Sequence, residues 1–207
     1  MIKLVDILKE ILDKASIGTK HGEGGQHNVH NYGTDKVIKR AYRGGNIKNN
    51  ENIKIFNEYP EIFPKVYDIG EKYIILEKLD DKKSQKELWE MKKILFSLDG
   101  KYVSNQESPK NNYIADLLRT SRVNKQNMFF YRNGSITEMI YENLEDNKLK
   151  SELQKELPSN LYGILIDNYY PLLKQIKNLP WSSKHAKDVN DENFGYNLNG
   201  ELKMLDI

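Results

Sequence analysis

The first third of the chain changes from a helix-like to a strand-like pattern of hydrophobic and polar positions. Over residues 2–14, apolar side chains recur every three or four positions, which predicts an amphipathic helix. Short runs rich in β-branched and aromatic residues then predict strands at 29–32 and 36–42, joined by a Gly-Thr-Asp turn at 33–35. A helical pattern returns at 50–59 and should end at the prolines that follow it.

The next part of the chain becomes predominantly helical. Two further strands are expected on either side of Gly70, and beyond them apolar residues recur at helical spacing. Ser84 with Glu87, and Ser135 with Glu138, have the spacing of a capping box. In this motif the serine side chain bonds the backbone N–H group of the glutamate, and the glutamate side chain bonds that of the serine, at the start of a helix. We therefore expect helices to begin at both serines.

The last fifty residues combine a long helix with a hairpin. An apolar period runs over 160–178, and Pro171 should kink this helix because proline has no N–H group and its ring clashes with the preceding turn. Two short strands, 194–198 and 202–205, flank an Asn-Gly pair, which is the strongest hairpin signal in the sequence. Because strands gather in the first third and helices after it, the sequence predicts the α+β class.

The composition describes an ordinary globular chain and excludes several classes of protein. Of the 207 residues, 38% are hydrophobic, enough for a core, and the 32 basic and 30 acidic side chains leave a formal net charge of +2. This balance indicates neither a nucleic-acid nor a membrane partner, and no apolar run is long enough for a transmembrane helix. Cysteine is absent, which excludes disulfides and thiolate chemistry and fits a cytoplasmic protein.

Three oxygen-bearing side chains near the C-terminus are expected to come together. Asp188 and Asn193 lie five residues apart on one predicted loop, and Asp206 ends the second strand of the hairpin that begins just after Asn193. Because a hairpin brings its two ends together, Asp206 should lie near that loop. Carboxylate and amide oxygens are the ligands that Mg²⁺ accepts, usually beside water and phosphate oxygens.

The N-terminal third carries residue types that suit phosphate. Gly22, Gly24 and Gly25 precede a predicted strand, and glycines let backbone N–H groups approach a phosphate closely. Lys39 lies on the strand after the next turn, where its ammonium group can pair with phosphate oxygens.

Together these features resemble the signatures of the protein-kinase-like superfamily, which includes protein kinases and aminoglycoside-type phosphotransferases. Residues 22–29, GEGGQHNV, resemble the glycine-rich loop G-x-G-x-x-G-x-V, and Lys39 resembles the strand lysine of V-A-I-K. Asp188, Asn193 and Asp206 resemble the catalytic-loop Asp, the Asn five residues after it and the Asp of the DFG motif. The chain is also similar to short kinase-like proteins encoded by phages.

The resemblance implies a bilobal α+β fold and an ATP- and Mg²⁺-dependent chemistry. Residues 1–79 would form a small β-rich N-lobe, and 80–207 a truncated, mostly helical C-lobe. Asp188 would be the catalytic base and Lys39 a catalytic lysine, while Asn193 and Asp206 would bind the metal. The implied nucleotide-binding residues are Gly22, Gly24, Gly25, Val29, Lys39, its ion-pair partner Glu51 (with Glu58 as second choice), and the hinge residues Glu77 and Lys78.

The chain departs from the family pattern at several positions. His27 stands where the glycine-rich loop has its third glycine, and His185 lies three residues before Asp188 where the family spacing is two. The DFG motif is reduced to Asp206-Ile207, where the chain ends, so no activation segment follows. The resemblance covers 16–79 and 160–207.

Three functions are compatible with these observations. The first is an ATP- and Mg²⁺-dependent phosphotransferase that acts on a hydroxyl acceptor, either a protein or a small molecule. The second is a pseudokinase that keeps the fold and contacts another protein, an alternative favoured by the missing activation segment and opposed by the intact set of polar residues. The third is nucleotidyl transfer to a protein, with ATP bound in a reversed orientation.

Overall fold

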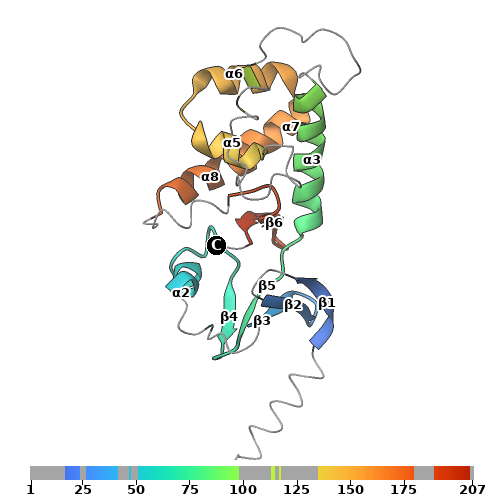
Figure 1. Cartoon of the computed structure of the whole chain (residues 1–207), viewed down its shortest axis with the longest axis vertical. Coiled ribbons are helices and arrows are strands. Elements are labelled where there is room, and N and C mark those ends of the chain that lie inside the picture. The colour runs from blue at the N-terminus through green and yellow to red at the C-terminus, as the bar shows by residue number, and fades with distance from the viewer. Residues whose placement is uncertain are drawn as a thin grey trace, which may run out of the picture. The chain divides into compact units, whose positions relative to one another are not determined.

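The computed structural model describes residues 17–23, 27–41, 47, 51–97, 113–114, 117, 135–179 and 189–205. Internal contacts divide the chain into two compact units (Figure 1). Unit 1 comprises Met1–Leu79 with Asn197–Asn199, and unit 2 comprises Asp80–Tyr196 with Gly200–Ile207. The predicted helix over 2–14 lies outside the described residues.

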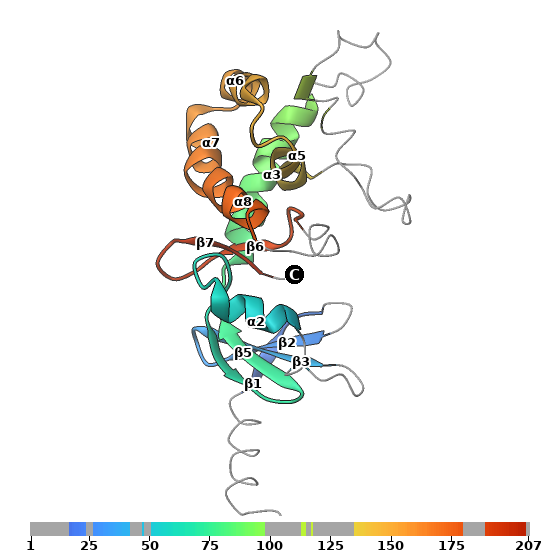
Figure 2. The same ribbon diagram turned by 90° about the vertical axis from the view of Figure 1, so that its left-hand side faces the viewer.

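Unit 1 is built on one antiparallel sheet of five strands in the order β1-β2-β3-β5-β4 (Figure 2). Strands β2 and β3 form a hairpin whose turn contains Gly33 at a φ of 72°, in the left-handed region that glycine adopts without strain. The predicted strands, the turn and the helix after them are therefore confirmed. The elements are β1 (Ile17–Glu23), β2 (His27–Tyr32), β3 (Lys36–Ala41), α2 (Glu51–Glu58), β4 (Val66–Ile69) and β5 (Tyr73–Glu77).

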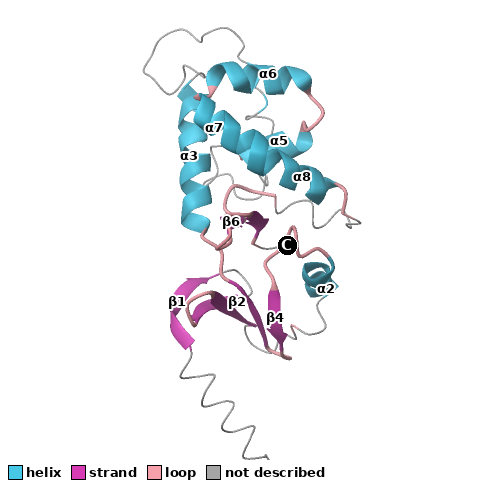
Figure 3. Ribbon diagram, turned by 180° about the vertical axis from the view of Figure 1, so that it is seen from behind, coloured by secondary structure: helices cyan, strands magenta, loops and turns pink. Residues whose placement is uncertain are grey.

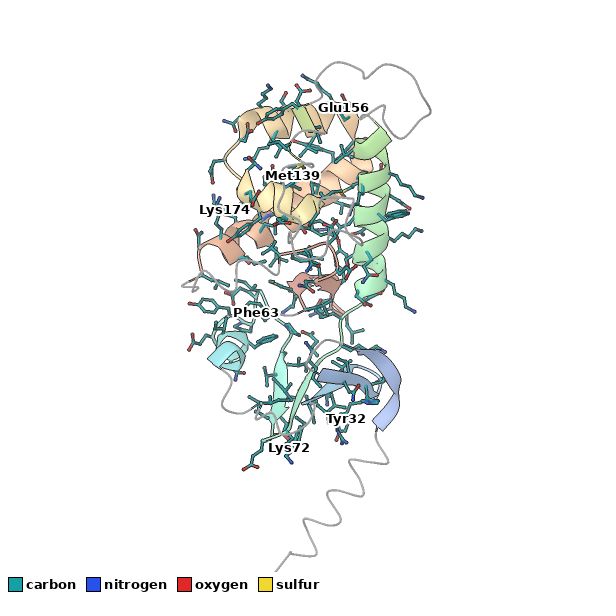
Figure 4. All side chains as sticks on the ribbon, in the orientation of Figure 1. Tyr32, Phe63, Lys72, Met139, Glu156 and Lys174 are labelled. Atoms are coloured by element: carbon teal, nitrogen blue, oxygen red, sulfur yellow. The ribbon has the colours of Figure 1, made fainter. Side chains whose placement is uncertain are left out.

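The core of unit 1 is formed by apolar side chains of the central strands and of the segment after α2. Ile38 on β3 and Leu76 on β5 are almost fully buried, and so is Phe63, whose ring centroid lies 4.8 Å from that of Phe56 (Figure 4). All three central residues of β5 are buried, which indicates that both faces of this strand are covered.

Unit 2 is mostly helical, with a small hairpin of two strands (Figure 3). Met139 lies fully buried among the helices (Figure 4). None of the described helices combines the length and the apolar composition needed to cross a membrane. The elements are α3 (Asp81–Ser97), α5 (Ile136–Glu142), α6 (Asn147–Glu156), α7 (Ser159–Ile164), the π-helix η1 (Leu165–Tyr169), α8 (Tyr170–Lys177), β6 (Phe194–Tyr196) and β7 (Leu202–Met204). The expected α+β class is thus confirmed.

One of the two predicted helix caps is right and the other is wrong. Ser135 caps α5, where its Oγ accepts a hydrogen bond from the N–H of Glu138 at 3.1 Å. Ser84 does not begin a helix, because α3 already starts at Asp81 and the carboxylate of Asp80 accepts from the N–H of Lys83 at 3.3 Å. Aspartate is as good a cap as serine, so the capping role falls to the acid four residues earlier.

The long helix predicted over 160–178 is present as the continuous run α7–η1–α8. Its irregularity is a π-helical turn that ends next to Pro171, in which the N–H of Tyr170 bonds to the carbonyl of Leu165 five residues back. Proline provides no N–H group and crowds the preceding turn, so the widened turn accommodates it without breaking the helix.

The terminal hairpin forms where the Asn-Gly pair predicts it. Strands β6 and β7 pair antiparallel with Phe194 opposite Met204 and Tyr196 opposite Leu202. Gly200 lies in the turn at a φ of 80°, and no atom lies within 4 Å of the position that a Cβ would take. Its backbone conformation alone therefore selects glycine at this position.

Replacing Gly200 with Ala should lower the free energy of unfolding by about 1 kcal/mol, because an L-residue is strained at positive φ. Gly163→Ala is the matched control, since Gly163 lies inside α7 and its added Cβ would approach only Asp167, at 4.0 Å. In a helix the same change should raise the free energy of unfolding by about 0.5–1 kcal/mol. Urea denaturation measures both, and shifts of equal sign would contradict the prediction.

Candidate functional site

The predicted phosphate-binding residues of unit 1 lie in one row across the sheet. Gly22 on β1 is opposite Val29 on β2, Val29 is opposite Lys39 on β3, and Lys39 is opposite Ile74 on β5. Directly opposed residues of an antiparallel sheet project to the same face. The half-buried Lys39 therefore stands between two apolar neighbours, on the face where Gly22 contributes no side chain.

The remaining predicted residues of the glycine-rich region and of the first helix are only partly described. The register of β1 against β2 is irregular between Lys20 and Gly22, where the glycine segment begins. Gly24 and Gly25 lie outside the described residues. Glu51 is the first residue of α2, and its side chain lies outside the described part, so its pairing with Lys39 stays a prediction.

The predicted hinge residues use their backbone N–H groups within unit 1. Glu77 donates its N–H group to the carbonyl of Lys65 at 2.8 Å, and Lys78 donates to the carbonyl of Asp35 at 2.9 Å. The Glu77 carboxylate accepts from the N–H of Lys65 at 3.2 Å. The N–H groups of both predicted hinge residues are therefore already paired within unit 1.

In unit 2, Asn193 is fixed beside the end of β7. Its carbonyl accepts from the N–H of Leu205 at 2.8 Å, and its own N–H group donates to the carbonyl of Asn190 at 3.1 Å. Leu205 directly precedes Asp206 in the sequence. Asp206 and Asp188 both lie outside the described residues, so the convergence of the three side chains stays a prediction.

Asp191 anchors the predicted catalytic loop to the start of α5. Its Oδ1 accepts from the hydroxyl of Ser135 at 2.9 Å and from both the N–H and the hydroxyl of Thr137, at 3.0 and 2.9 Å. Its Oδ2 accepts from the N–H of Ile136 at 3.3 Å and pairs with the Lys92 ammonium group at 3.4 Å. The carboxylate thereby satisfies N–H groups at a helix N-terminus, where negative charge is favoured.

Sequence reasoning missed Asp191, although part of its environment was predicted. The capping box at Ser135 identified the N-terminus of α5, which attracts a carboxylate. Nothing in the local pattern indicates that the carboxylate comes from a residue 56 positions further along the chain.

Apolar packing fixes the loop on both sides of Asp191. Val189 and Phe194 are almost fully buried, and the Phe194 ring meets that of Tyr169 edge to face with centroids 6.0 Å apart. The Ser84 hydroxyl, inside α3, lies 2.5 Å from the carbonyl oxygen of Phe194 and donates to it. Residues 189–194 are thus held by both their side chains and their backbone.

A buried polar network ties β6 to α3 and the π-helical turn. The Glu87 carboxylate accepts from the hydroxyl groups of Tyr196 at 2.7 Å and Tyr169 at 3.3 Å, and Asn168 donates to the Tyr196 hydroxyl at 3.2 Å. Burial, with the nearby Glu87 charge adding to it, raises the pKa of both tyrosines above the ordinary value. Both hydroxyl groups therefore stay protonated and act as donors to Glu87.

Within the described ranges, no three His, Asp or Glu side chains gather closely enough to hold a metal ion. The predicted magnesium ligands are Asn193, which is described, and Asp206, which is not. Their amide and carboxylate oxygens are hard donors of the kind that suits Mg²⁺.

Comparison with known proteins finds similarity only among solved structures. No family model matches the chain, and no curated protein matches it. A gentamicin complex of APH(2")-IIa has a TM-score of 0.36 and 15% identity, with 100% of this chain and 70% of that chain covered. The ADP-bound aminoglycoside phosphotransferase APH(2'')-Ib has a TM-score of 0.36 and 13% identity, with 99% and 70% covered.

A third structure, APH(2")-IIia with GDP and kanamycin, has a TM-score of 0.32 and 15% identity, with 99% of this chain and 75% of that chain covered. The nucleotides and antibiotics named here are ligands of those proteins. In this chain the strands of the five-stranded sheet come first, with α2 between β3 and β4 in the sequence, and helices and a terminal hairpin follow.

Proposed function

We propose that this protein is an ATP- and Mg²⁺-dependent phosphotransferase that acts on a hydroxyl acceptor, either a protein or a small molecule. The observation that carries the proposal is the anchored loop at 189–194. Asp191 holds it to α5 and α3, and the carbonyl of Asn193 accepts from Leu205 at 2.8 Å. Phosphoryl transfer depends mainly on positioning and electrostatics, so a rigid loop beside the predicted base and metal ligands suits it.

Residues of unit 1 would orient the nucleotide. Gly22, Val29 and Lys39 share one face of the sheet, which supports a phosphate-binding role for the lysine next to a glycine that contributes no side chain. The Lys39 ammonium group would pair with phosphate oxygens, and Glu51 at the start of α2 would pair with Lys39. Gly24, Gly25 and the carbonyl groups of Glu77 and Lys78 would complete the nucleotide contacts.

Residues of unit 2 would hold the metal and the acceptor. Asn193 and Asp206 would bind Mg²⁺, which when bound neutralises negative charge on the transferred phosphoryl group. Asp188 directly precedes the buried Val189 in the sequence. Its carboxylate would orient the acceptor hydroxyl and take its proton as the oxygen–phosphorus bond forms and ADP leaves.

ATP should raise the melting temperature of the full chain, and the shift should grow when Mg²⁺ is added. A ligand that binds only the folded state stabilises it by mass action, by about 2.7 kcal/mol at a concentration 100 times its Kd. Thermal denaturation with ATP, Mg²⁺, or both measures the effect. The site-directed variant is Lys39→Ala, and Lys72→Ala, at an exposed position beside β5, is its matched control.

Lys39→Ala should reduce the shift caused by ATP with Mg²⁺, whereas Lys72→Ala should leave it unchanged. A chain that shows no shift at millimolar ATP with Mg²⁺ has no nucleotide function of this kind, and the proposal would then be wrong. An equal loss in both variants would contradict the role assigned to Lys39.

A further inference from the structure

The outward face of α3 carries a straight stripe of three lysines and a tryptophan. Lys82, Lys86, Trp89 and Lys93 are all exposed and follow one another at spacings of four, three and four residues. At about 100° per residue these positions fall within a sector of roughly 60°, and they extend over about 16 Å of helix. Lys82, Lys86, Trp89 and Lys93 are called the α3 stripe below.

The stripe points away from the core because the opposite side of α3 is buried. Ser84, Leu88, Met91 and Leu95 have almost no exposed surface and hold the helix against the rest of unit 2. Trp89 by contrast is 53% exposed, and it is one of only three large hydrophobic residues with substantial exposure in the described part of the chain. A tryptophan in such a position offers a large area that a partner can remove from water.

The lysines of the stripe are not used for internal ion pairs. In the described part of unit 2, Lys92 on the same helix pairs with Asp191, whereas Lys82 and Lys86 have no carboxylate within salt-bridge distance. The Lys93 ammonium group lies 5.4 Å from the centroid of the Trp89 ring, in cation–π distance. Among the described residues of α3, the exposed acid is Glu90, four residues after Lys86 and three before Lys93, so it borders the stripe without forming an ion pair with either lysine.

We propose that the α3 stripe is a docking surface for an acidic segment of another protein. Carboxylates on the partner would pair with the three lysines, and an apolar partner residue would cover Trp89. A peptide is favoured over a nucleic acid because the stripe has only three lysines, fewer than the phosphate contacts of a typical nucleic-acid site. The near-neutral chain, with a formal net charge of +2, also lacks the general basic surface of nucleic-acid-binding proteins.

This proposal does not depend on phosphoryl transfer and can be tested without any enzyme activity. The probe is a fluorescein-labelled peptide of about 12 residues in which glutamates alternate with a few leucines, long enough to cover the stripe. Its companion has every Glu replaced by Gln. Fluorescence anisotropy with the full chain should show saturable binding of the Glu peptide, weakened at least tenfold by raised salt or by the Gln replacement.

Lys82→Glu combined with Lys86→Glu should weaken binding of the Glu peptide by at least about tenfold, because two attractive charges become repulsive. Trp89→Ala should weaken it by a similar factor, because tryptophans buried at an interface contribute much of its binding energy. The matched control reverses the same number of charges at two exposed lysines away from α3: Lys72, just before β5, and Lys174 on α8 (Figure 4). All these side chains are exposed, so circular dichroism should show every variant folded. The control variant should bind like the unchanged protein.

Three results would overturn the proposal. The Glu peptide could fail to bind at millimolar concentration. The control variant could lose as much affinity as the stripe variants, which would mean that total charge and not the α3 stripe is responsible. A single-stranded oligonucleotide could bind more tightly than the peptide with the same dependence on Trp89, which would identify a nucleic-acid surface instead.

Discussion

Phosphoryl transfer should fall by about 10²–10⁴-fold when Asp188 is replaced by Asn, while ATP binding stays nearly unchanged. Asparagine keeps the size of the side chain, but its neutral amide cannot take the proton of the acceptor hydroxyl. It also lacks the negative charge that attracts this proton. The assay follows the transfer of labelled phosphate from ATP to the protein itself, to a cell lysate and to small hydroxyl compounds. The nucleotide affinity of the same variant is measured by thermal shift.

Asp206→Asn is the informative comparison for Asp188→Asn, because it should weaken nucleotide binding, which Asp188→Asn should leave nearly unchanged. It removes a charge from the predicted metal site, so the Mg²⁺-dependent part of nucleotide binding should weaken. If Asp188→Asn transfers label as fast as the unchanged protein, the catalytic-loop assignment is wrong. If the unchanged protein binds ATP but transfers no label to any acceptor, the protein is a binding module of the pseudokinase kind.

Replacing Asp191 with Ala should lower the free energy of unfolding by about 3 kcal/mol, which for a chain of this size is about 6–12 °C in melting temperature. The carboxylate, with 16% of its side chain exposed, accepts from Ser135, Ile136 and Thr137 and pairs with Lys92. Its removal takes one acceptor away from several donors and from the Lys92 ammonium group, in a mostly buried position. Urea denaturation followed by the helical circular dichroism signal measures the loss.

Glu192→Ala is the matched control for Asp191→Ala. Glu192 is the next residue in the same loop, but it is exposed, so its removal should change stability by less than about 0.5 kcal/mol. Asp191→Asn should fall between the two, since an amide oxygen can replace one acceptor but not the charge. Equal stability of Asp191→Ala and Glu192→Ala would show that the anchoring contacts contribute little.

Local chemistry was enough to predict most elements of both units. The hairpins at Gly33 and Gly200 follow from turn residues that tolerate positive φ, and the helix start at Ser135 follows from a side chain that bonds three residues ahead. The α+β class follows from the change in hydrophobic period along the chain. Each of these features depends on residues within a few positions of one another.

The error at Ser84 shows where a local rule stops being sufficient. Ser84 has the correct spacing to Glu87 for a capping box, but both side chains are used elsewhere in unit 2. Ser84 donates to the carbonyl of Phe194, 110 residues away, and Glu87 accepts from Tyr169 and Tyr196. A spacing rule cannot distinguish a serine that caps a helix from one that bonds to a distant strand.

The sequence by itself determined most of the secondary structure, the α+β class and the chemical types at the candidate site: a lysine on a central strand, an Asp-x₄-Asn loop and an aspartate after a hairpin. The tertiary structure alone decided what holds that loop. Asp191 meets Lys92 from 99 residues away and Ser135 from 56 residues away. Such contacts depend on how helices and loop pack around a common core, because only burial brings distant polar groups together and makes their pairing obligatory.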